Sequence, residues 1–309
     1  MGLSIAAGAL AGIIIFFMGM TMMSDAVLSL ATRRLKKILS IFTGHPLLGV
    51  LIGAFITALT QSSSGTTVMV VSLVNANILN LYQAAAIIMG ANIGSTITVQ
   101  LISYDFFAVI PHLLFLGILL YHLRLTPKIR EFGRFLTGFA LLFFGMRIMV
   151  QSLYPLKNLL EFQNLIYSLA DRRALAISLG AFITAVIQSS SAGIAVLQSL
   201  AFQGLIDLSH AFPILMGQNI GTCATTLISS IAADKNGKRA AVIHLLFNLL
   251  GTLFFLPLID FFISFVIYLT PDNTVRQIAN AHTFFNLITV MLLMPFISIL
   301  VLLSKKIIR

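Results

Sequence analysis

The sequence has little charge, a single cysteine and no tryptophan. Of its 309 residues only 9% are charged, whereas 59% are hydrophobic and the mean hydropathy is +1.03. Soluble proteins carry roughly a quarter of their residues as charges, so this composition excludes a soluble globular domain. The lone cysteine, Cys223, excludes a disulfide within the chain. We therefore expect an all-α polytopic membrane protein.

Apolar runs of nearly twenty residues recur along the chain and predict about seven full membrane spans. Residues 1–30 have no basic leader and no Ala-x-Ala cleavage site at the end of the apolar run, so we expect a first span here and not a removed signal. The predicted spans cover about 4–28, 84–102, 107–123, 135–152, 211–232, 240–262 and 279–303.

The few charges are mostly basic, and they gather between the spans. Four clusters, at 33–37, 124–134, 235–239 and 305–309, hold 14 of the 19 Lys and Arg residues. Basic loops mark the cytoplasmic side of a membrane protein. We expect these three loops and the C-terminus to be cytoplasmic in a multi-pass protein of the cell (inner) membrane. The net charge of +10 is thereby explained without nucleic acid.

A polar segment occurs twice in this apolar chain. Residues 53–64 read GAFITALTQSSS and residues 180–191 read GAFITAVIQSSS, 127 positions apart. At this offset 22 of the 52 positions in 53–104 are identical, including MGANIG at 89–94 and MGQNIG at 216–221. The duplication predicts a repeat over 1–126, a second over 127–264, and an extra C-terminal span over 265–309.

The centres of the two segments are too polar to face lipid, because hydroxyl and carboxamide groups there would lack partners. We expect two re-entrant hairpins or broken helices, at about 46–74 and 174–202. If both are re-entrant, all four basic clusters lie on one side and each repeat has three full spans. The second repeat is then inverted, an architecture of many secondary transporters.

The predicted helix breaks carry a definite chemistry. A helix that starts inside the membrane presents free N–H groups and the positive end of its dipole, and such ends bind anions. Two of them with two Ser triplets would suit a tetrahedral oxyanion. Carbonyl and Gln side-chain oxygens freed at the breaks would suit a small hard cation such as sodium. Because no paired basic residues lie in these segments, a bound anion needs co-bound cations.

The paired QSSS motifs, each followed about thirty residues later by Met-Gly-x-Asn-Ile-Gly-[Ser/Thr], resemble the type II sodium/phosphate cotransporter family. The resemblance covers both repeats. It implies sodium-driven uptake of inorganic phosphate by alternating access, with phosphate held between the hairpins and with sodium as coupling ion and no other cofactor. It implies that phosphate contacts Gln61, Ser62, Ser63, Ser64, Asn92, Gln188, Ser189, Ser190, Ser191 and Asn219. It implies sodium ligands at Gln188, Ser189, Thr222 and Thr225, with Gln61, Ser62, Ser95 and Thr98 as the first-repeat equivalents.

The chain departs from the family pattern in two places. Many bacterial relatives carry a soluble helical regulatory domain after the last span, whereas this chain stops at Arg309, so regulation by that route is not expected. In electrogenic animal members an aspartate follows the first Asn-Ile-Gly span, and the nearest candidate here, Asp105, lies several residues earlier. Phosphate, sodium and the lipid bilayer are the expected partners, with a homodimer as a candidate assembly.

Other functions share some of these features. Phosphate export, or transport of another oxyanion such as sulfate or arsenate, would use the same fold. A phosphate sensor would bind without flux. An intramembrane serine hydrolase could use Ser63 or Ser64, but neither motif has a nearby His or Lys as base, so we do not expect an enzyme. Two simpler roles are also expected: Gly90, Gly94, Gly217 and Gly221 permit close helix packing, and His244 and His282 form structural hydrogen bonds.

Overall fold

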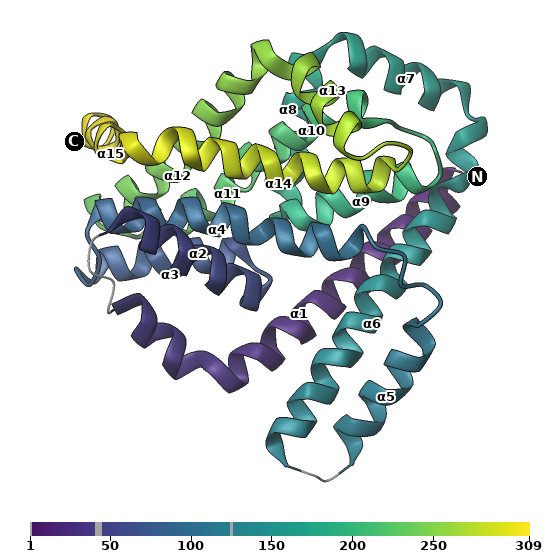
Figure 1. Ribbon diagram of the computed structural model, residues 1–309, viewed down its shortest axis with the longest axis horizontal. Coiled ribbons are helices and arrows are strands. Elements are labelled where there is room, and N and C mark those ends of the chain that lie inside the picture. Colours follow the sequence, from purple (N-terminus) through teal and green to yellow (C-terminus); the bar gives the residue numbers. More distant parts are fainter. Residues whose placement is uncertain (1, 41–44, 124–125) are drawn as a thin grey trace.

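The computed structural model describes residues 2–40, 45–123 and 126–309, and this part of the chain consists of helices and short connections with no strand (Figure 1). Side chains of residues 31–40, 167, 170 and 171 lie outside the description, and so do the predicted basic cluster at 33–37 and Arg124. The helices of the first half are α1 (Gly2–Ser40), α2 (Pro46–Thr60), α3 (Ser63–Asn75), α4 (Leu81–Ile102) and α5 (Ile110–His122). Those of the second half are α6 (Pro127–Leu153), α7 (Leu160–Asp171), α8 (Arg173–Ile187), α9 (Ser190–Phe202), α10 (Leu208–Gly221), α11 (Cys223–Ser229), α12 (Lys235–Phe255), α13 (Ile259–Leu269), α14 (Thr274–Leu293) and α15 (Ile297–Ile307). Short 3-10 turns η1 (Tyr154–Asn158), η2 (Leu256–Leu258) and η3 (Met294–Phe296) complete it.

Within the described residues, five helical segments are long and apolar enough to cross a membrane, which confirms a polytopic α-helical membrane protein. They are Gly2–Leu30, Leu81–Ile102, Pro127–Asn158, Lys235–Leu269 and Thr274–Ile307. The other two predicted spans differ from expectation. Helix α5 has 13 residues, about 20 Å at 1.5 Å per residue, short of the ~30 Å hydrocarbon core. The predicted span at 211–232 is divided at Thr222 into α10 and α11, although Thr222 keeps helical φ and ψ of −57° and −28° and its N–H donates to the Gln218 carbonyl oxygen at 3.1 Å.

Both QSSS segments interrupt a helix at the same place. Helix α2 ends at Thr60, and Gln61 takes a left-handed backbone with φ 53° and ψ 23° before α3 begins at Ser63. In the second copy α8 ends at Ile187 and Gln188 has φ 60° and ψ 22°. A left-handed residue other than glycine is unfavourable and persists where its surroundings hold it. The chain folds back at each break, because the Thr57 and Thr66 hydroxyls on either side of Gln61 lie 2.9 Å apart and Thr184 lies beside Gly193. The two predicted hairpin regions are therefore helical hairpins, α2–α3 and α8–α9, and each is called a broken helix below.

Glycines at matching positions let each broken helix pack closely on the long helix that follows it. A Cβ added at Gly90 of α4 would overlap the Val50 carbonyl oxygen of α2, and one at Gly217 of α10 would overlap the Ile177 carbonyl oxygen of α8. No larger residue fits while these backbones stay in contact. The packing role expected for Gly90 and Gly217 is confirmed.

The first helices of the two repeats pack antiparallel. Helices α1 and α6 hold corresponding places in the repeats and pack against each other through Gly12 and Gly145 at one level and Gly19 and Gly138 at another. Residue numbers rise along α1 as they fall along α6, so the two helices are antiparallel. Antiparallel packing of equivalent helices is the signature of inverted repeats, as predicted.

The two repeats also contact each other in the interior. The Thr67 hydroxyl of α3 lies 2.8 Å from the Thr226 hydroxyl of α11, so the first broken helix meets the end of the second repeat. In return, Gln198 of α9 donates to the carbonyl oxygen of Val99 near the end of α4, at 3.2 Å. Each half thus packs its broken helix against the other half's long helix.

The C-terminal helices repeat the pair before them. Helix α14, turn η3 and helix α15 follow α12, η2 and α13 at an offset of 38 residues, with the hexapeptide HLLFNL at 244–249 matched by HTFFNL at 282–287. Helix α12 packs on α3 and α4, and α14 packs on α9 and α10 as well as α4. The boundary predicted at 264 falls inside α13. The division into 1–126, 127–264 and 265–309 stays a prediction.

Two parts of the molecule lie outside this duplicated core. Helix α5 packs along α6, and the pair projects from the rest of the helices (Figure 1). Between α6 and α8 the chain forms η1 and helix α7, because apolar residues recur at helical spacing there.

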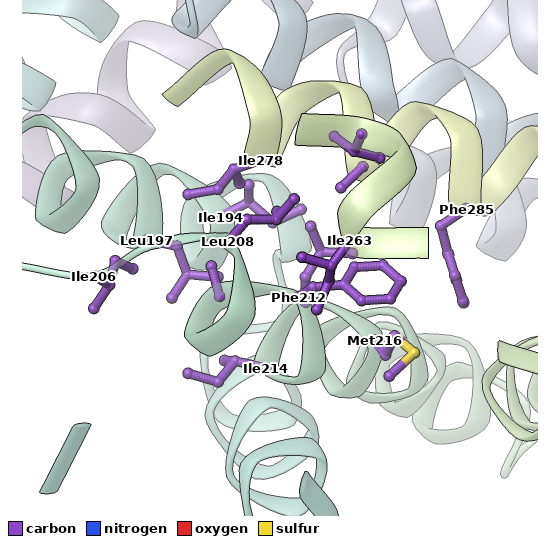
Figure 2. Close-up of a cluster of buried hydrophobic side chains, with 14 of the residues drawn as sticks. Ile194, Leu197, Ile206, Leu208, Phe212, Ile214, Met216, Ile263, Ile278 and Phe285 are labelled. Atoms are coloured by element: carbon purple, nitrogen blue, oxygen red, sulfur yellow. The ribbon is translucent and has the colours of Figure 1, made fainter. Parts of the chain in front are cut away.

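The apolar interior is formed by side chains that surround the broken helices. Figure 2 shows one part of it, where Phe212 of α10 lies among side chains of α9, α13 and α14 such as Ile194, Ile263 and Phe285. The Phe212 ring centroid is 4.6 Å from that of Phe262 and 6.2 Å from that of Phe285. These contacts hold α10, and with it the second broken helix, against the C-terminal helices.

Candidate ion-binding site between the two broken helices

A small cavity lies where the two helix breaks face each other. Its volume is about 100 Å³, room for an ion or a few waters at about 30 Å³ each. The Ser64 hydroxyl donates to the carbonyl oxygen of Gln188 at 3.4 Å, across the junction of the repeats. The cavity is lined by Gln61, Ser62, Ser63, Ser64, Gln188, Ser189, Ser190 and Ser191, with Phe17 and Met20 of α1. The structure therefore brings both predicted QSSS motifs to one place.

The first Ser of each motif caps its own helix. The Ser62 side chain accepts from the backbone N–H of Gly65 at 3.0 Å, and Ser189 accepts from that of Ala192 at 3.3 Å. Each hydroxyl still has its hydrogen to donate. The N-termini of α3 and α9 both begin at the cavity, so two positive helix-dipole ends act on the same space.

The cavity lining, as far as the structure describes it, contains no charged side chain. Donors are hydroxyl, carboxamide and backbone N–H groups, and acceptors are carboxamide and carbonyl oxygens. Ser63 and Ser190 are buried at 9% and 4% exposure, so part of the lining is shielded from water. Such a site can hold an anion through hydrogen bonds and dipoles and a small cation through oxygens.

The two glutamines differ in their surroundings. Both polar atoms of the Gln61 side chain are hydrogen-bonded, since its Nε2 donates to the Ala58 carbonyl oxygen at 2.6 Å and its Oε1 accepts from the Thr98 hydroxyl. Gln188 is exposed, and its backbone N–H donates to the Thr184 carbonyl oxygen at 2.7 Å. The predicted residue Thr98 thus reaches the site through Gln61.

The remaining predicted residues lie on the helices behind the cavity and do not line it. Asn92 donates to Asn248 Oδ1 of α12 at 2.9 Å, and the Ser95 hydroxyl donates to the Asn92 carbonyl oxygen at 2.7 Å. In the second repeat Asn219 donates to the Leu215 carbonyl oxygen at 3.3 Å and Thr222 to that of Gln218 at 3.0 Å. Hydroxyls in membrane helices commonly bond back in this way. The hydroxyl oxygen of Thr225 is buried and makes no hydrogen bond within the described structure.

A chain of buried polar contacts connects the site region to α12, and the sequence analysis did not foresee it. Thr67 contacts Thr226, and the Thr226 hydroxyl lies 3.0 Å from Nδ1 of His244. All three side chains are fully buried. One signal in the sequence could have indicated these contacts. His244 and Asn248 are four residues apart on an apolar helix, and the same spacing recurs at His282 and Asn286. The structural hydrogen bond expected of His244 is present, whereas the ring nitrogens of His282 make none in the described part of the chain.

The two halves of the core are not equal. In the first repeat the Thr57 hydroxyl donates to that of Thr66 at 2.9 Å. The equivalent positions in the second repeat are Thr184 and Gly193, and the amide of Gln218 lies against Gly193 where the Thr66 hydroxyl would be. The Thr184 hydroxyl and Gln218 Oε1 are buried without a hydrogen bond among the described residues. The second repeat therefore keeps free oxygen acceptors beside α8 and α9.

Inverted repeats whose broken helices meet at a polar, uncharged cavity define a membrane transport protein for small ions. The chain belongs to the Na+/Pi-cotransporter family, whose profile matches residues 15–151 and 157–295, one match in each half. This family consists of transporters that handle sodium and phosphate.

Curated relatives agree with this assignment. The chain is 33% identical to the uncharacterized protein YqeW of Bacillus subtilis over 84% of both chains. It is 27% identical to YjbB of Escherichia coli, named as a candidate inorganic phosphate export protein, over 81% of this chain and 46% of that one, so it spans less than half of YjbB. Over 26% of this chain and 14% of the relative it is 41% identical to the sodium-dependent phosphate transport protein 2C of Mus musculus. No solved structure matches the chain.

Proposed function

We propose that the protein couples sodium ions to the uptake of inorganic phosphate by alternating access, with phosphate held in the cavity between the two QSSS motifs. The observation that carries the proposal is the cavity itself, in which two segments 127 residues apart supply matching serines and two helix N-termini. Family membership supports sodium and phosphate as the transported ions.

The chemistry of the lining explains why sodium would be required. Phosphate at neutral pH carries one or two negative charges, and the described lining offers no basic side chain against them. Two helix dipoles compensate only part of that charge, since each end acts as roughly half an elementary charge. Co-bound sodium supplies the rest, which makes the binding of each ion depend on the other.

We place the sodium ligands mainly in the second repeat. The Thr222 hydroxyl lies at the junction of α10 and α11, and Thr225 Oγ1 is buried without a partner in the described part of the protein. Together with Gln188 and Ser189 they form the set of oxygens that a hard cation prefers. In the first repeat α4 is continuous and Thr98 is already bonded to Gln61, so we expect the equivalent set there to bind sodium more weakly.

Uptake of labelled phosphate into proteoliposomes tests the proposal. We expect uptake to need an inward sodium gradient and to be lost in Gln61→Ala and Gln188→Ala. A matched control is Gln163→Ala, because Gln163 lies on α7 away from the cavity and donates only to the Lys157 carbonyl oxygen in the described structure. Uptake that ignores the sodium gradient would contradict the coupling. Normal uptake by both cavity variants would contradict the site.

A second candidate is phosphate export or transport of another oxyanion, and the name of YjbB favours considering it. Reversing the sodium gradient in loaded vesicles distinguishes efflux from uptake, and competition by sulfate or arsenate measures selectivity. A sensor would bind phosphate without flux. Labelling of Ser63 or Ser190 by a fluorophosphonate probe would revive the hydrolase hypothesis.

A further inference from the structure

Two larger pockets lie at opposite ends of the helical core and are related by the same internal duplication. The α3–α4 pocket, of about 460 Å³, is lined by Val74, Asn77, Leu79, Asn80, Leu81, Tyr82, Asn236, Val301 and Lys305. The α9–α10 pocket, of about 480 Å³, is lined by Lys157, Phe162, Gln163, Ile166, Gly204, Leu205, Ile206, Asp207, His210 and Thr274. The first lies beside the chain's C-terminal end and the second beside α7, at the other side of the view in Figure 1.

Corresponding residues show that the two pockets are equivalent. Asn80 precedes α4 as Asp207 precedes α10, 127 residues later, and each caps its helix through its side chain. Asn236 at the start of α12 corresponds to Thr274 at the start of α14, 38 residues later. The pockets therefore share one backbone plan and differ in their side chains.

The difference is one of charge. In the α9–α10 pocket the Asp207 carboxylate lies 2.6 Å from Nδ1 of His210. Partial burial raises the pKa of Asp207, but hydrogen bonds from Ser209 and the His210 amide and the charge of the His210 ring outweigh this, and the pKa lies below its usual value. At neutral pH the lining of this pocket therefore carries a carboxylate as well as the positive charge of Lys157.

The α3–α4 pocket presents positive charge at the equivalent place. Asn80 is neutral, and Lys305 is the charged residue of the described lining. Two basic clusters meet there, because Arg239 donates to the Ile308 carbonyl oxygen and to Asn236 Oδ1, both at 3.0 Å. Five further basic residues lie within four positions of Asn236 or Lys305 in the sequence, namely Lys235, Lys238, Arg239, Lys306 and Arg309.

We propose that the α3–α4 pocket binds the phosphate headgroup of an anionic phospholipid from the leaflet on the side of the basic loops. Lys305 supplies the charge, and the carboxamides of Asn77, Asn80 and Asn236 and the Tyr82 hydroxyl supply further donors. Apolar residues next to the pocket stay exposed, namely Ile78 at 53%, Leu302 at 53% and Ile307 at 57%, and they offer a surface for acyl chains. Charge and apolar surface together favour a lipid over a free anion.

The site joins elements that the transport cycle would move. Its walls come from the end of α3, the start of α4, the start of α12 and the end of α15. A headgroup seated there contacts the first broken helix and the C-terminal helices at once. Binding itself does not depend on the proposed phosphate transport, and so the two can fail separately.

The absence of tryptophan allows a direct test. Tyr82→Trp places the chain's only tryptophan in the α3–α4 pocket, and Phe162→Trp places one in the equivalent α9–α10 pocket. In phosphatidylcholine vesicles with a minor fraction of brominated lipid, we expect brominated phosphatidylglycerol to quench Tyr82→Trp more than brominated phosphatidylcholine does. Phe162→Trp should show no such preference. Equal quenching of Tyr82→Trp by both lipids would overturn the proposal.

Two neighbouring lysines give a matched pair of variants. Lys305→Gln should lower the preference for the anionic lipid about fivefold, because one basic residue at an anionic surface contributes about that factor. Lys306→Gln removes the same charge one residue outside the lining and should change the preference less. Equal effects would show that only the general surface charge matters. Relief of quenching by millimolar inorganic phosphate would assign the pocket to a free anion instead.

If Tyr82→Trp fails to fold, native mass spectrometry of the unaltered protein gives a second measurement. Protein purified from membranes that contain phosphatidylglycerol should retain this lipid in preference to zwitterionic lipid, and Lys305→Gln should retain less of it. Retention without regard to headgroup charge would contradict the proposal.

Discussion

Gln61 and Gln188 show how a residue with good helix propensity is held in a backbone state it rarely adopts. The repeated polar motif was enough to predict that a helix breaks in each half. It could not identify the residue that turns, because glutamine favours helices and left-handed glutamine is stabilised only by tertiary contacts. The Gln61 side chain bonds to Ala58 and Thr98, which lie on separate helices. The partner on the second helix, Thr98, is 37 residues away and cannot be read from the segment that contains Gln61.

A residue-scale prediction concerns the capping role of Ser189. Ser189→Ala removes the cap of α9 and should destabilise the protein by about 1 kcal/mol, whereas Ser189→Asn keeps a capping oxygen and should retain most of the stability. Thermal unfolding in detergent, followed by circular dichroism, measures both. Should Ser189→Asn unfold as early as Ser189→Ala, the hydroxyl would serve something other than the cap.

A second residue-scale prediction concerns helix contact. Gly217→Ala places a methyl group against the Ile177 carbonyl oxygen, so α8 and α10 must separate, and overpacking of this kind costs about 1–3 kcal/mol. Gly65→Ala is the matched control, since its Cβ would meet only the Ser62 side chain and alanine favours helices by about 1 kcal/mol. Size-exclusion profiles after mild heating compare the two. A Gly217→Ala protein as stable as Gly65→Ala would contradict the close packing.

At the scale of elements, the contact of α3 with α11 links one repeat's broken helix to the other repeat. Thr67→Cys and Thr226→Cys, on a Cys223→Ser background, should form a disulfide on oxidation because their hydroxyl oxygens lie 2.8 Å apart. We expect oxidation to stop phosphate uptake reversibly if these helices move during transport.

The single-cysteine variants serve as controls for this cross-link and should not respond to the oxidant. Both positions are buried, so thiols are labelled after denaturation, and loss of that labelling in the double variant reports that the disulfide has formed. Full uptake with the disulfide complete would mean that α3 and α11 stay together throughout the cycle.

The order of elements was partly predictable from periodicity and repeats. Segment 53–64 and its copy stood out because polar residues are rare in the chain, and the helices after them followed from apolar length. The similarity of α14 to α12 was not predicted, because the matching segments 244–249 and 282–287 are short and mostly apolar. Helix α5 was expected to span, yet at 13 residues its apolar run is bounded by turns.

At the scale of the whole molecule, loop charges predict orientation. Lys157 in η1 and Lys305 near the C-terminus lie at opposite ends of the core, beside the two equivalent pockets. On a Cys223→Ser background, Lys157→Cys should react with an impermeant maleimide on intact cells, whereas Lys305→Cys should react only after permeabilisation. Reaction of both cysteines on intact cells would contradict the predicted orientation.

The inverted arrangement of the repeats could be predicted because loop charge and span number constrain each other. The positions of Asn92 and Asn219 behind the cavity could not be predicted, because both residues belong to a motif that looks like part of the cavity. Asn92 bonds to Asn248, a residue 156 positions away on α12. Side chains on a helix face their neighbours in space, and those neighbours are set by the packing of the whole bundle.

The unequal halves of the core carry a consequence for the other end of the cycle. The long helix of the second repeat is divided at Thr222, whose φ of −57° and ψ of −28° stay helical, whereas α4 runs undivided through the equivalent Ser95. If the repeats exchange conformations when access switches sides, then in the opposite state each repeat has the conformation that the other repeat has here. A structure of that state should show α4 divided near Ser95, and α10 and α11 joined into one continuous helix.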